Sequence, residues 1–315
     1  MAQTHHFTVV DTYTPLREAF ELWLESLQAR QASPKTIRGY RSEVGAFIRF
    51  LEAQGITSLE EVQALHIRKW LIHRQAQGVS PAQLHHDWRK PRTFWRWALR
   101  EELVAHDAFA KAEAPKLRYA VKPCLTPEQV DALLNACEGK HWTRLRDKAL
   151  LLVLLDTGAR ASEVHSLTVE SANRETVWVQ GKGGKQRPLF LSPATRLALR
   201  RYLNSCPFKP EPNQPLWWGK RGALTLWGML EVIEKIGKRT GISPLGAHVF
   251  RRTHAVWSLR SGLDLARLQK MLGHSSVSVL VKHYLPLLES DLREAHRQYS
   301  PVNTLLHNRK PRESR

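Results

Sequence analysis

Residues 246–284 read GAHVFRRTHAVWSLRSGLDLARLQKMLGHSSVSVLVKHY. The apolar residues of this stretch recur at the three- and four-residue intervals of a helix. Between them stand His248, Arg251, His274 and Tyr284. A tyrosine accompanied by an arginine and histidines is typical of a nucleophile with partners that stabilise the charge of a phosphate. The stretch therefore predicts a reactive site.

The chain is strongly basic, with 315 residues, a formal net charge of +19 and a pI of about 10.2. A globular chain this basic usually binds a polyanion, although charge alone does not separate a nucleic acid from an anionic membrane. The sequence has 17 basic and 13 acidic residues before Tyr119, and 31 basic and 16 acidic from there on. The length fits about two domains, and the second carries most of the excess charge.

Cysteine usage and hydropathy narrow the class of protein. The three cysteines, Cys124, Cys137 and Cys206, are odd in number and show no C-x-x-C spacing. This disfavours a disulfide framework or a zinc site and fits a reducing cytoplasm. The N-terminus has no signal-peptide pattern, and no apolar run approaches the ~18 residues of a membrane span. We therefore expect a cytoplasmic protein with no membrane partner.

The first domain is expected to be helical over residues 16–114, after a flexible leader at 1–15 and before a basic linker at 115–124. Ser33-Pro34 and Ser80-Pro81 each give an N-cap followed by proline at the first helical position. They predict a helix that ends near Gly55 and another that Pro91 breaks or kinks. A helix from Leu16 and one over about 58–77 complete the set.

The helix that begins at Ser80-Pro81 interleaves aromatic residues with arginines. We interpret most of the rings as core beneath a basic face, and the alternative is a helix whose rings touch bases. On either interpretation the basic residues are suited to DNA phosphates. The expected DNA-binding residues of this domain are Lys35, Arg38, Arg41, Arg89, Lys90, Arg92 and Arg96.

The second domain is expected at 125–290, followed by a C-terminal helix and basic tail at 291–315. Thr126-Pro127-Glu128-Gln129 is a capping-box pattern, and the run ALLLVLLDTG predicts a buried central helix. Residues 176–180 and 187–191 alternate around a glycine-rich turn and predict a hairpin. With the strand-like residues 167–169 they suggest a three-stranded sheet in a mainly α domain.

Several polar residues of this domain are ambiguous when each is taken alone. Arg160 either pairs with Glu163 for structural reasons or is oriented by it to grip a phosphate. Lys182 lies in the turn G-K-G-G, which is an exposed turn, a nucleotide-binding loop, or a tip that reaches into a groove. A strand follows instead of a helix, which argues against a nucleotide-binding P-loop. Lys185 is the rival of Lys182 in that turn.

The last motif residues are also ordinary when each is read singly. His248 and Arg251 are three residues apart and share a helix face. Arg252 and His254 are nearby residues of the same types that could be mistaken for them. His274 follows Leu-Gly, a helix-ending signal that exposes its ring.

Taken together, the motifs resemble the tyrosine recombinase family, which is phage integrase-like and Xer-like. RDKALLLVLLDTGARASEV is similar to its first arginine box, and VQGKGGKQRPLFL to its lysine hairpin. HVFRRTHA, LGHSS and KHYLPL are similar to the H-x-x-R, second-histidine and nucleophile boxes. The resemblance covers roughly residues 16–290. The interval between the last two boxes is one residue longer than the family's commonest one, a length that integrase-like members also show.

The resemblance implies a mechanism and a set of roles. The nucleophile would be Tyr284, in preference to His283 and Tyr299, and it would form a 3′-phosphotyrosyl bond. The implied catalytic residues are Arg160, Lys182, His248, Arg251, His274 and Tyr284, with Glu163 as the orienting residue. Lys185, Arg187 and Arg252 join the expected DNA-binding residues. No cofactor is implied, since the covalent bond conserves the phosphodiester energy without a metal ion or ATP.

The expected fold is mainly α with a small antiparallel β-sheet, arranged as a two-domain DNA clamp. The partner would be double-stranded DNA with a specific recombination site, bound by a homo-tetramer, with or without a second recombinase as an additional partner. The protein would be bacterial or encoded by a mobile element and associated with the nucleoid. The activity would be integration, excision or resolution of a mobile element or replicon dimer. The alternatives are a type IB topoisomerase-like enzyme and a catalytically inert DNA-binding regulator.

Overall fold

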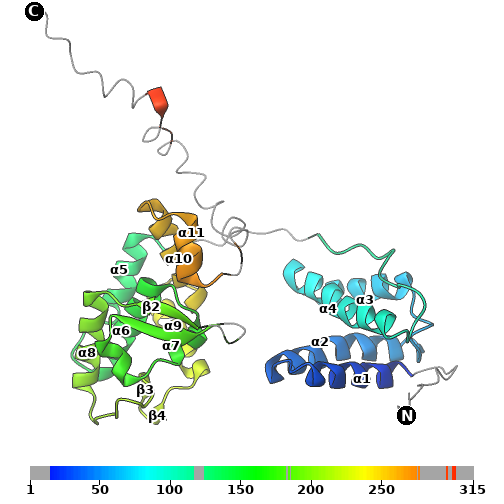
Figure 1. Ribbon diagram of the computed structural model, residues 1–315, viewed down its shortest axis with the longest axis horizontal. Coiled ribbons are helices and arrows are strands. Elements are labelled where there is room, and N and C mark those ends of the chain that lie inside the picture. The colour runs from blue at the N-terminus through cyan, green and yellow to red at the C-terminus, as the bar shows by residue number, and fades with distance from the viewer. Residues whose placement is uncertain are drawn as a thin grey trace, which may run out of the picture. The chain divides into compact units, whose positions relative to one another are not determined.

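The computed structural model describes residues 15–116, 124–181, 184, 186–274, 276, 296 and 300–302. The chain divides into two compact units, Met1–Ala120 and Val121–Arg315, each built around its own hydrophobic core. The described residues are mainly helical, with small antiparallel sheets (Figure 1). This confirms the expected fold class.

Over residues 15–116, the described part of the first unit, the chain forms four helices: α1 Leu16–Ala29, α2 Pro34–Glu52, α3 Ala64–Ala76 and α4 Pro81–Arg100. The caps at Ser33 and Ser80 are confirmed, since each hydroxyl accepts a hydrogen bond from the N–H three residues on, both at 3.2 Å. The third helix begins later than the expected position near 58. The Glu61 carboxylate accepts from the N–H of Thr57 at 2.9 Å, which holds this segment in a turn.

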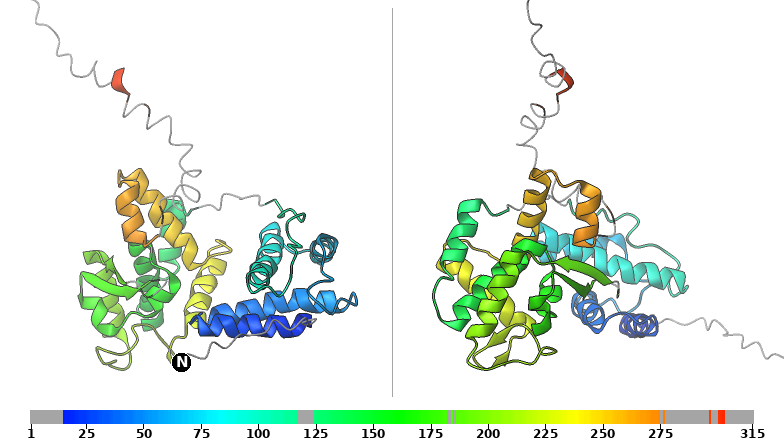
Figure 2. Two further views of the ribbon diagram at one scale, coloured as in Figure 1. Left: turned by 45° about the vertical axis from the view of Figure 1, so that its right-hand side comes forward. Right: turned by 60° about the vertical axis from the view of Figure 1, so that its left-hand side comes forward.

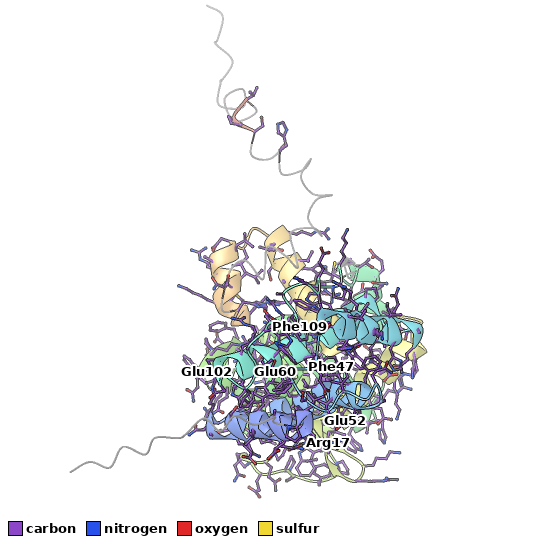
Figure 3. All side chains as sticks on the ribbon, turned by 90° about the vertical axis from the view of Figure 1, so that its right-hand side faces the viewer. Arg17, Phe47, Glu52, Glu60, Glu102 and Phe109 are labelled. Carbon is purple, nitrogen blue, oxygen red and sulfur yellow. The ribbon has the colours of Figure 1, made fainter. Side chains whose placement is uncertain are left out.

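Aromatic side chains fill the interior of this unit. The rings of Phe47 and Phe109 have centroids 6.4 Å apart (Figure 3), and Trp88, Trp95 and Trp97 are all buried. The interpretation of these rings as core is therefore confirmed. Near the surface, Arg17 pairs with Glu52 and ties α1 to α2 (Figure 3).

Helix α4 runs through Pro91 and continues to Arg100, so the break that the sequence allowed at this proline is absent. Proline has no N–H, so the carbonyl of Asp87 loses its helical donor. The indole N–H of Trp70, on α3, donates to that carbonyl at 3.1 Å. A side chain from another helix thus replaces the missing hydrogen bond.

The second unit begins with α5 Pro127–Asn135, α6 Trp142–Thr157, α7 Ala161–His165 and the 3-10 helix η1 Val169–Asn173. It continues with strands β1 Thr176–Gln180 and β2 Gln186–Phe190 and helix α8 Pro193–Ser205. It ends, within the described residues, with β3 Trp218–Gly219, β4 Gly222–Ala223, α9 Leu226–Arg239, α10 Ala247–Arg260 and α11 Leu265–Leu272.

Helix α6 lies at the centre of this unit, as the apolar run predicts. Ala149, Leu150 and Val153 are fully buried, and the helix packs against α8 and α10. It ends at Gly158, whose φ of 56° is left-handed. Helices α10 and α11 lie next to each other (Figure 2).

The expected hairpin is present as β1 and β2, which pair antiparallel from Thr176↔Phe190 to Gln180↔Gln186. The expected third strand is absent from the described residues. There, Thr168 forms only an isolated bridge with Pro215, and the chain then turns into η1. The second small sheet is the pair β3 and β4.

Candidate active site

The sequence motifs fall on both described and undescribed residues. The structure describes Arg160, Glu163, Arg187, His248, Arg251, Arg252 and His274. Lys182, Lys185 and Tyr284 lie outside the described residues, as does most of the expected C-terminal helix and tail. The described part of the candidate site therefore consists of arginines, histidines and Glu163.

Arg160 lies three residues beyond the end of α6 and forms the N-cap of α7. Its N–H donates to Glu163 at 2.7 Å, and its Nη1 donates to the same carboxylate at 2.8 Å. The side chain of Arg160 keeps 27% of its surface exposed, while Glu163 keeps 1%. The pair that the sequence left open is therefore real, and Arg160 still presents a face to solvent.

Arg187, on β2, is the second partner of Glu163. Its Nε and Nη2 lie 3.2 and 2.6 Å from the two carboxylate oxygens, and its Nη1 donates to the carbonyl of Met271. Arg187 is among the expected DNA-binding residues, and in this structure its side chain is buried and paired with Glu163. Strand alternation is the signal for this, since Arg187 has the same parity as the buried Leu189.

The carboxylate of Glu163 is held in its charged form. Burial alone would raise the pKa of Glu163, but the hydrogen bonds from Arg187 and from the backbone of Arg160 outweigh it. The pKa of Glu163 consequently lies below its usual value. One negative charge thus stands between two arginines, which leaves the group of three with a net positive charge.

Arg251, in α10, is buried and reaches two other elements. Its Nη1 donates to the Gly158 carbonyl at 2.9 Å, and its Nη2 donates to the Leu272 carbonyl at 2.7 Å. The same Nη2 lies 3.0 Å from Nε2 of His274. Arginine only donates, so Nε2 of His274 is the acceptor and the proton of a neutral ring is on Nδ1.

The C-terminus of α11 gathers these arginines. Arg160 Nη2 donates to the Gly273 carbonyl at 3.1 Å, so the carbonyls of Met271, Leu272 and Gly273 each accept from a different arginine. Gly273 has a left-handed φ of 63°. A Cβ there would lie 2.6 Å from Cδ of Arg187, so the position requires glycine.

The remaining residues of the H-x-x-R motif occupy separate environments. His248 is exposed in the first turn of α10, and Arg252 is half-buried. His254 is buried, with Nδ1 2.9 Å from the Leu155 carbonyl. It therefore contributes to the end of α6 and is no solvent-facing rival of His248.

The expected DNA-binding residues of the first unit lie on α2 and α4, which pack together. Lys90 pairs with Glu43, and the Arg92 guanidinium lies 4.9 Å from the Trp88 ring centroid. Both are half-buried. The exposed members are Lys35, Arg38, Arg41, Arg89 and Arg96, of which Arg41 is paired with Glu21.

The described residues contain neither a metal-ligand cluster nor a membrane-spanning helix. They hold no cluster of three histidine, cysteine or acidic side chains arranged to hold a metal ion. Nor do they include a helix with the length and apolar character that a bilayer crossing requires.

Family models match both units of the chain. The model described as "Phage integrase family" matches residues 123–290, and "Phage integrase, N-terminal SAM-like domain" matches 20–102. The first match covers more than half of the chain. The chain belongs to the phage integrase family of tyrosine recombinases. It is a site-specific recombinase, as its curated relatives also indicate.

Two curated relatives are similar over nearly their whole length. Tyrosine recombinase XerC of Bacillus subtilis (strain 168) is 30% identical over 89% of this chain and 95% of the relative. Tyrosine recombinase XerD of Shewanella oneidensis is 29% identical over 91% and 97%. Among solved structures, the Tn1549 transposon integrase in complex with a circular intermediate DNA has a TM-score of 0.68 at 17% identity. That match covers 87% of this chain and 95% of the other, and it shows the shared fold.

Proposed function

We propose that this recombinase cleaves DNA with Tyr284 as the nucleophile. The phenolic oxygen attacks a phosphodiester, forms a 3′-phosphotyrosyl bond and releases a 5′-hydroxyl. Tyrosine has a reference pKa of about 10, so the reaction near neutrality needs charge stabilisation around the phosphate. A 5′-hydroxyl from a second duplex then attacks the phosphotyrosyl bond, which completes strand exchange and frees Tyr284.

The other motif residues have different roles around the phosphate: they stabilise charge, transfer protons or donate a hydrogen bond. Arg160 and Arg251 stabilise the negative charge of the non-bridging oxygens, since a guanidinium suits a phosphate. Lys182 protonates the leaving 5′-oxygen and His248 assists proton transfer. His274 donates a hydrogen bond to the phosphate.

One observation carries this proposal. Arg251 lies 3.0 Å from His274, and Arg160 donates to Gly273, the residue before that histidine. Residues 160, 251 and 274 are far apart in sequence, yet they converge on the end of α11. Two cations and a histidine at one place form the kind of cluster that stabilises a transferring phosphate.

The proposed substrate is double-stranded DNA with a specific recombination site. The exposed basic residues of α2 and α4, with Arg252 and Lys185 of the second unit, would contact phosphates, and the two units would clamp the duplex. We propose a homo-tetramer, with or without a second recombinase, acting in the bacterial cytoplasm on nucleoid DNA. Its task would be to integrate, excise or resolve a mobile element or a replicon dimer.

The test is a suicide substrate that carries a nick beside the cleavage site, drawn from DNA flanking the native gene. A denaturing gel shows a covalent protein–DNA adduct. We expect an adduct that resists EDTA and is lost in Tyr284→Phe, while Tyr299→Phe, the matched control, retains it.

Three results would contradict the proposal in different ways. An adduct that survives Tyr284→Phe would mean that another residue is the nucleophile. DNA that is bound without any adduct would favour an inert regulator. Relaxation of supercoiled plasmid that carries no recombination site would favour a topoisomerase-like enzyme.

A further inference from the structure

The end of α11 is held by hydrogen bonds that the helix itself cannot supply. The last carbonyls of any helix lack intrahelical donors, and buried carbonyls need partners. Here three consecutive carbonyls accept from Arg187, Arg251 and Arg160 in turn. The proposed function assigns a task to two of these arginines and none to Arg187.

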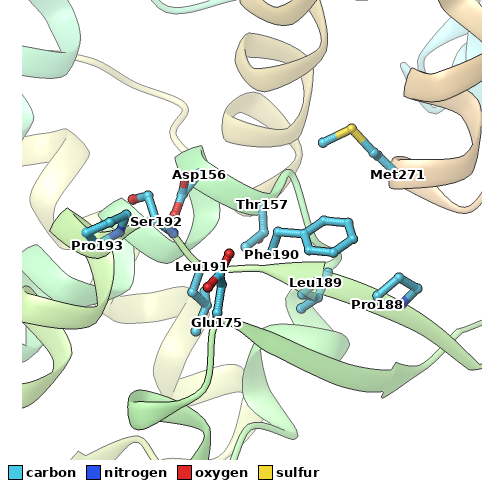
Figure 4. A pocket seen from close by; sticks show the side chains of 10 residues that line it. All are labelled: Asp156, Thr157, Glu175, Pro188, Leu189, Phe190, Leu191, Ser192, Pro193 and Met271. Atoms are coloured by element: carbon cyan, nitrogen blue, oxygen red, sulfur yellow. Dashed lines mark hydrogen bonds between the residues drawn. The ribbon is translucent and has the colours of Figure 1, made fainter.

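Arg187 bridges two parts of the site. One side of its guanidinium donates to both oxygens of Glu163, and the remaining nitrogen donates to Met271. Strand β2 also packs against α11. Met271 of α11 and Phe190 of β2 both line a pocket of about 260 Å³ (Figure 4). The end of α11 is thus fixed to β2 through the backbone carbonyl of Met271.

Charge supports a role for Arg187 beyond packing. Glu163 carries one negative charge and contacts two arginines. With Arg187 in place, the negative charge of Glu163 is shared between two guanidinium groups. Arg160 is then only partly neutralised and keeps positive charge for a phosphate. Without Arg187, Glu163 would neutralise Arg160 alone, and the site would attract a phosphate more weakly.

We propose that Arg187 is a positioning residue of the phosphate site. It orients Glu163 toward Arg160 and fixes the end of α11, so that Arg160 and His274 keep the places that the reaction requires. This inference rests on the proposed function, since it needs a phosphate bound at Arg160. Arg187 itself touches no substrate.

The experiment compares Arg187→Gln and Arg187→Lys with Arg146→Gln. Arg146 is the matched control, because it is a buried arginine of the same unit, with Nε 2.9 Å from Asp147 and Nη1 2.8 Å from the Trp218 carbonyl. The folded fraction of each variant is measured by circular dichroism. Adduct formation is measured in single turnovers at saturating enzyme, on a suicide substrate with either a phosphate or an uncharged methylphosphonate at the cleavage position.

Arg187→Gln is expected to slow adduct formation on the phosphate by about 100-fold per folded molecule, as loss of a charge-stabilising group does. DNA affinity should stay within about threefold of the wild type. The loss on the methylphosphonate should be about tenfold or less, because that group demands less positive charge from Arg160. Arg187→Lys should lose about tenfold on the phosphate, since lysine keeps the charge and lacks the fork.

Arg146→Gln should melt at a lower temperature and react as the wild type does per folded molecule on both substrates. The inference is overturned if folded Arg187→Gln or Arg187→Lys reacts at the wild-type rate. It is also overturned if the losses on phosphate and methylphosphonate are equal, because general damage would not depend on the charge of the substrate. Failure of the wild type to form an adduct on DNA that it binds would instead refute the proposed function.

Discussion

Nδ1 of His254 donates to the carbonyl oxygen of Leu155, 2.9 Å away, in the last turn of α6. A carbonyl only accepts, so the proton of the neutral ring is on Nδ1. The ring also lies against Gly158, where a Cβ would come within 2.7 Å of its Cδ2. His254 therefore caps α6 just before the segment that leads to Arg160.

This relationship predicts how stability depends on pH. Burial lowers the pKa of His254, and the bond to Leu155 and the charge of Asp156 only partly oppose it. Above the unfolded value of about 6.5, the neutral ring contributes its full stability. As pH falls below that value, the unfolded chain binds a proton that the folded chain does not, and stability is lost.

His254→Asn places an amide donor near the position of Nδ1 and does not titrate. We expect the free energy of unfolding of the wild type to fall more steeply between pH 7 and pH 5 than that of His254→Asn. Urea unfolding at each pH measures both, and every other histidine is common to the two proteins. Parallel curves would show that His254 titrates alike in the folded and unfolded chains.

The bond from Trp70 to Asp87 predicts a rescue between two substitutions. Trp70→Phe removes the donor that replaces the missing N–H of Pro91, and it should cost about 2 kcal/mol through an unsatisfied buried carbonyl and lost packing. Pro91→Ala restores a helical N–H for the same carbonyl. The double variant should therefore unfold at a higher urea concentration than Trp70→Phe alone.

Trp88→Phe is the matched control for that rescue. Its indole donates at 3.0 Å to the carbonyl of Ala112, which lies outside α4. Pro91→Ala supplies no donor to that carbonyl and should not rescue Trp88→Phe. Equal gains in both backgrounds would mean that Pro91→Ala merely improves the helix in general.

Helices α2 and α4 show what the sequence could and could not predict about the fold. The starts of α2 and α4 were predictable, because Ser33 and Ser80 satisfy donors only three residues away. The course of α4 through Pro91 was not, since the replacing donor comes from 17 residues before Asp87. Local rules carry no information about a partner supplied by another helix.

The candidate site follows the same division. Sequence motifs predicted Arg160, Glu163, Arg251 and His274 as site residues, because each stands in a recognisable box, and the structure brings them to the end of α11. The motifs placed Arg187 among the expected DNA-binding residues. They could not indicate its pairing with Glu163, because that residue lies 24 positions earlier in the sequence. Only the folded chain brings that pair together and turns an expected surface cation into a buried one.

Alanine substitutions at Gly241 and Gly273 should separate the cost of backbone strain from the cost of steric overlap in the free energy of unfolding. Gly241→Ala forces a side chain into a left-handed φ of 73° with nothing within 4 Å, and it should cost about 1 kcal/mol. Gly273→Ala adds overlap with Arg187, which should raise the cost to about 3 kcal/mol. Thermal unfolding compares the two variants, and equal costs would show that the chain at Gly273 relaxes away from Arg187.

Salt dependence of DNA binding separates exposed cations from paired ones. Arg38 is exposed on α2, whereas Lys90 on α4 is paired with Glu43. Each phosphate contact contributes about 0.9 to the slope of log K against log salt. Arg38→Gln should therefore reduce that slope by about 0.9, and Lys90→Gln should leave it nearly unchanged, because the charge of Lys90 is already compensated.

Fluorescence anisotropy with a labelled duplex over a range of salt concentrations measures both slopes. A larger change for Lys90→Gln would mean that its ion pair opens on DNA, and that the face of α4 contacts the backbone more closely than that of α2.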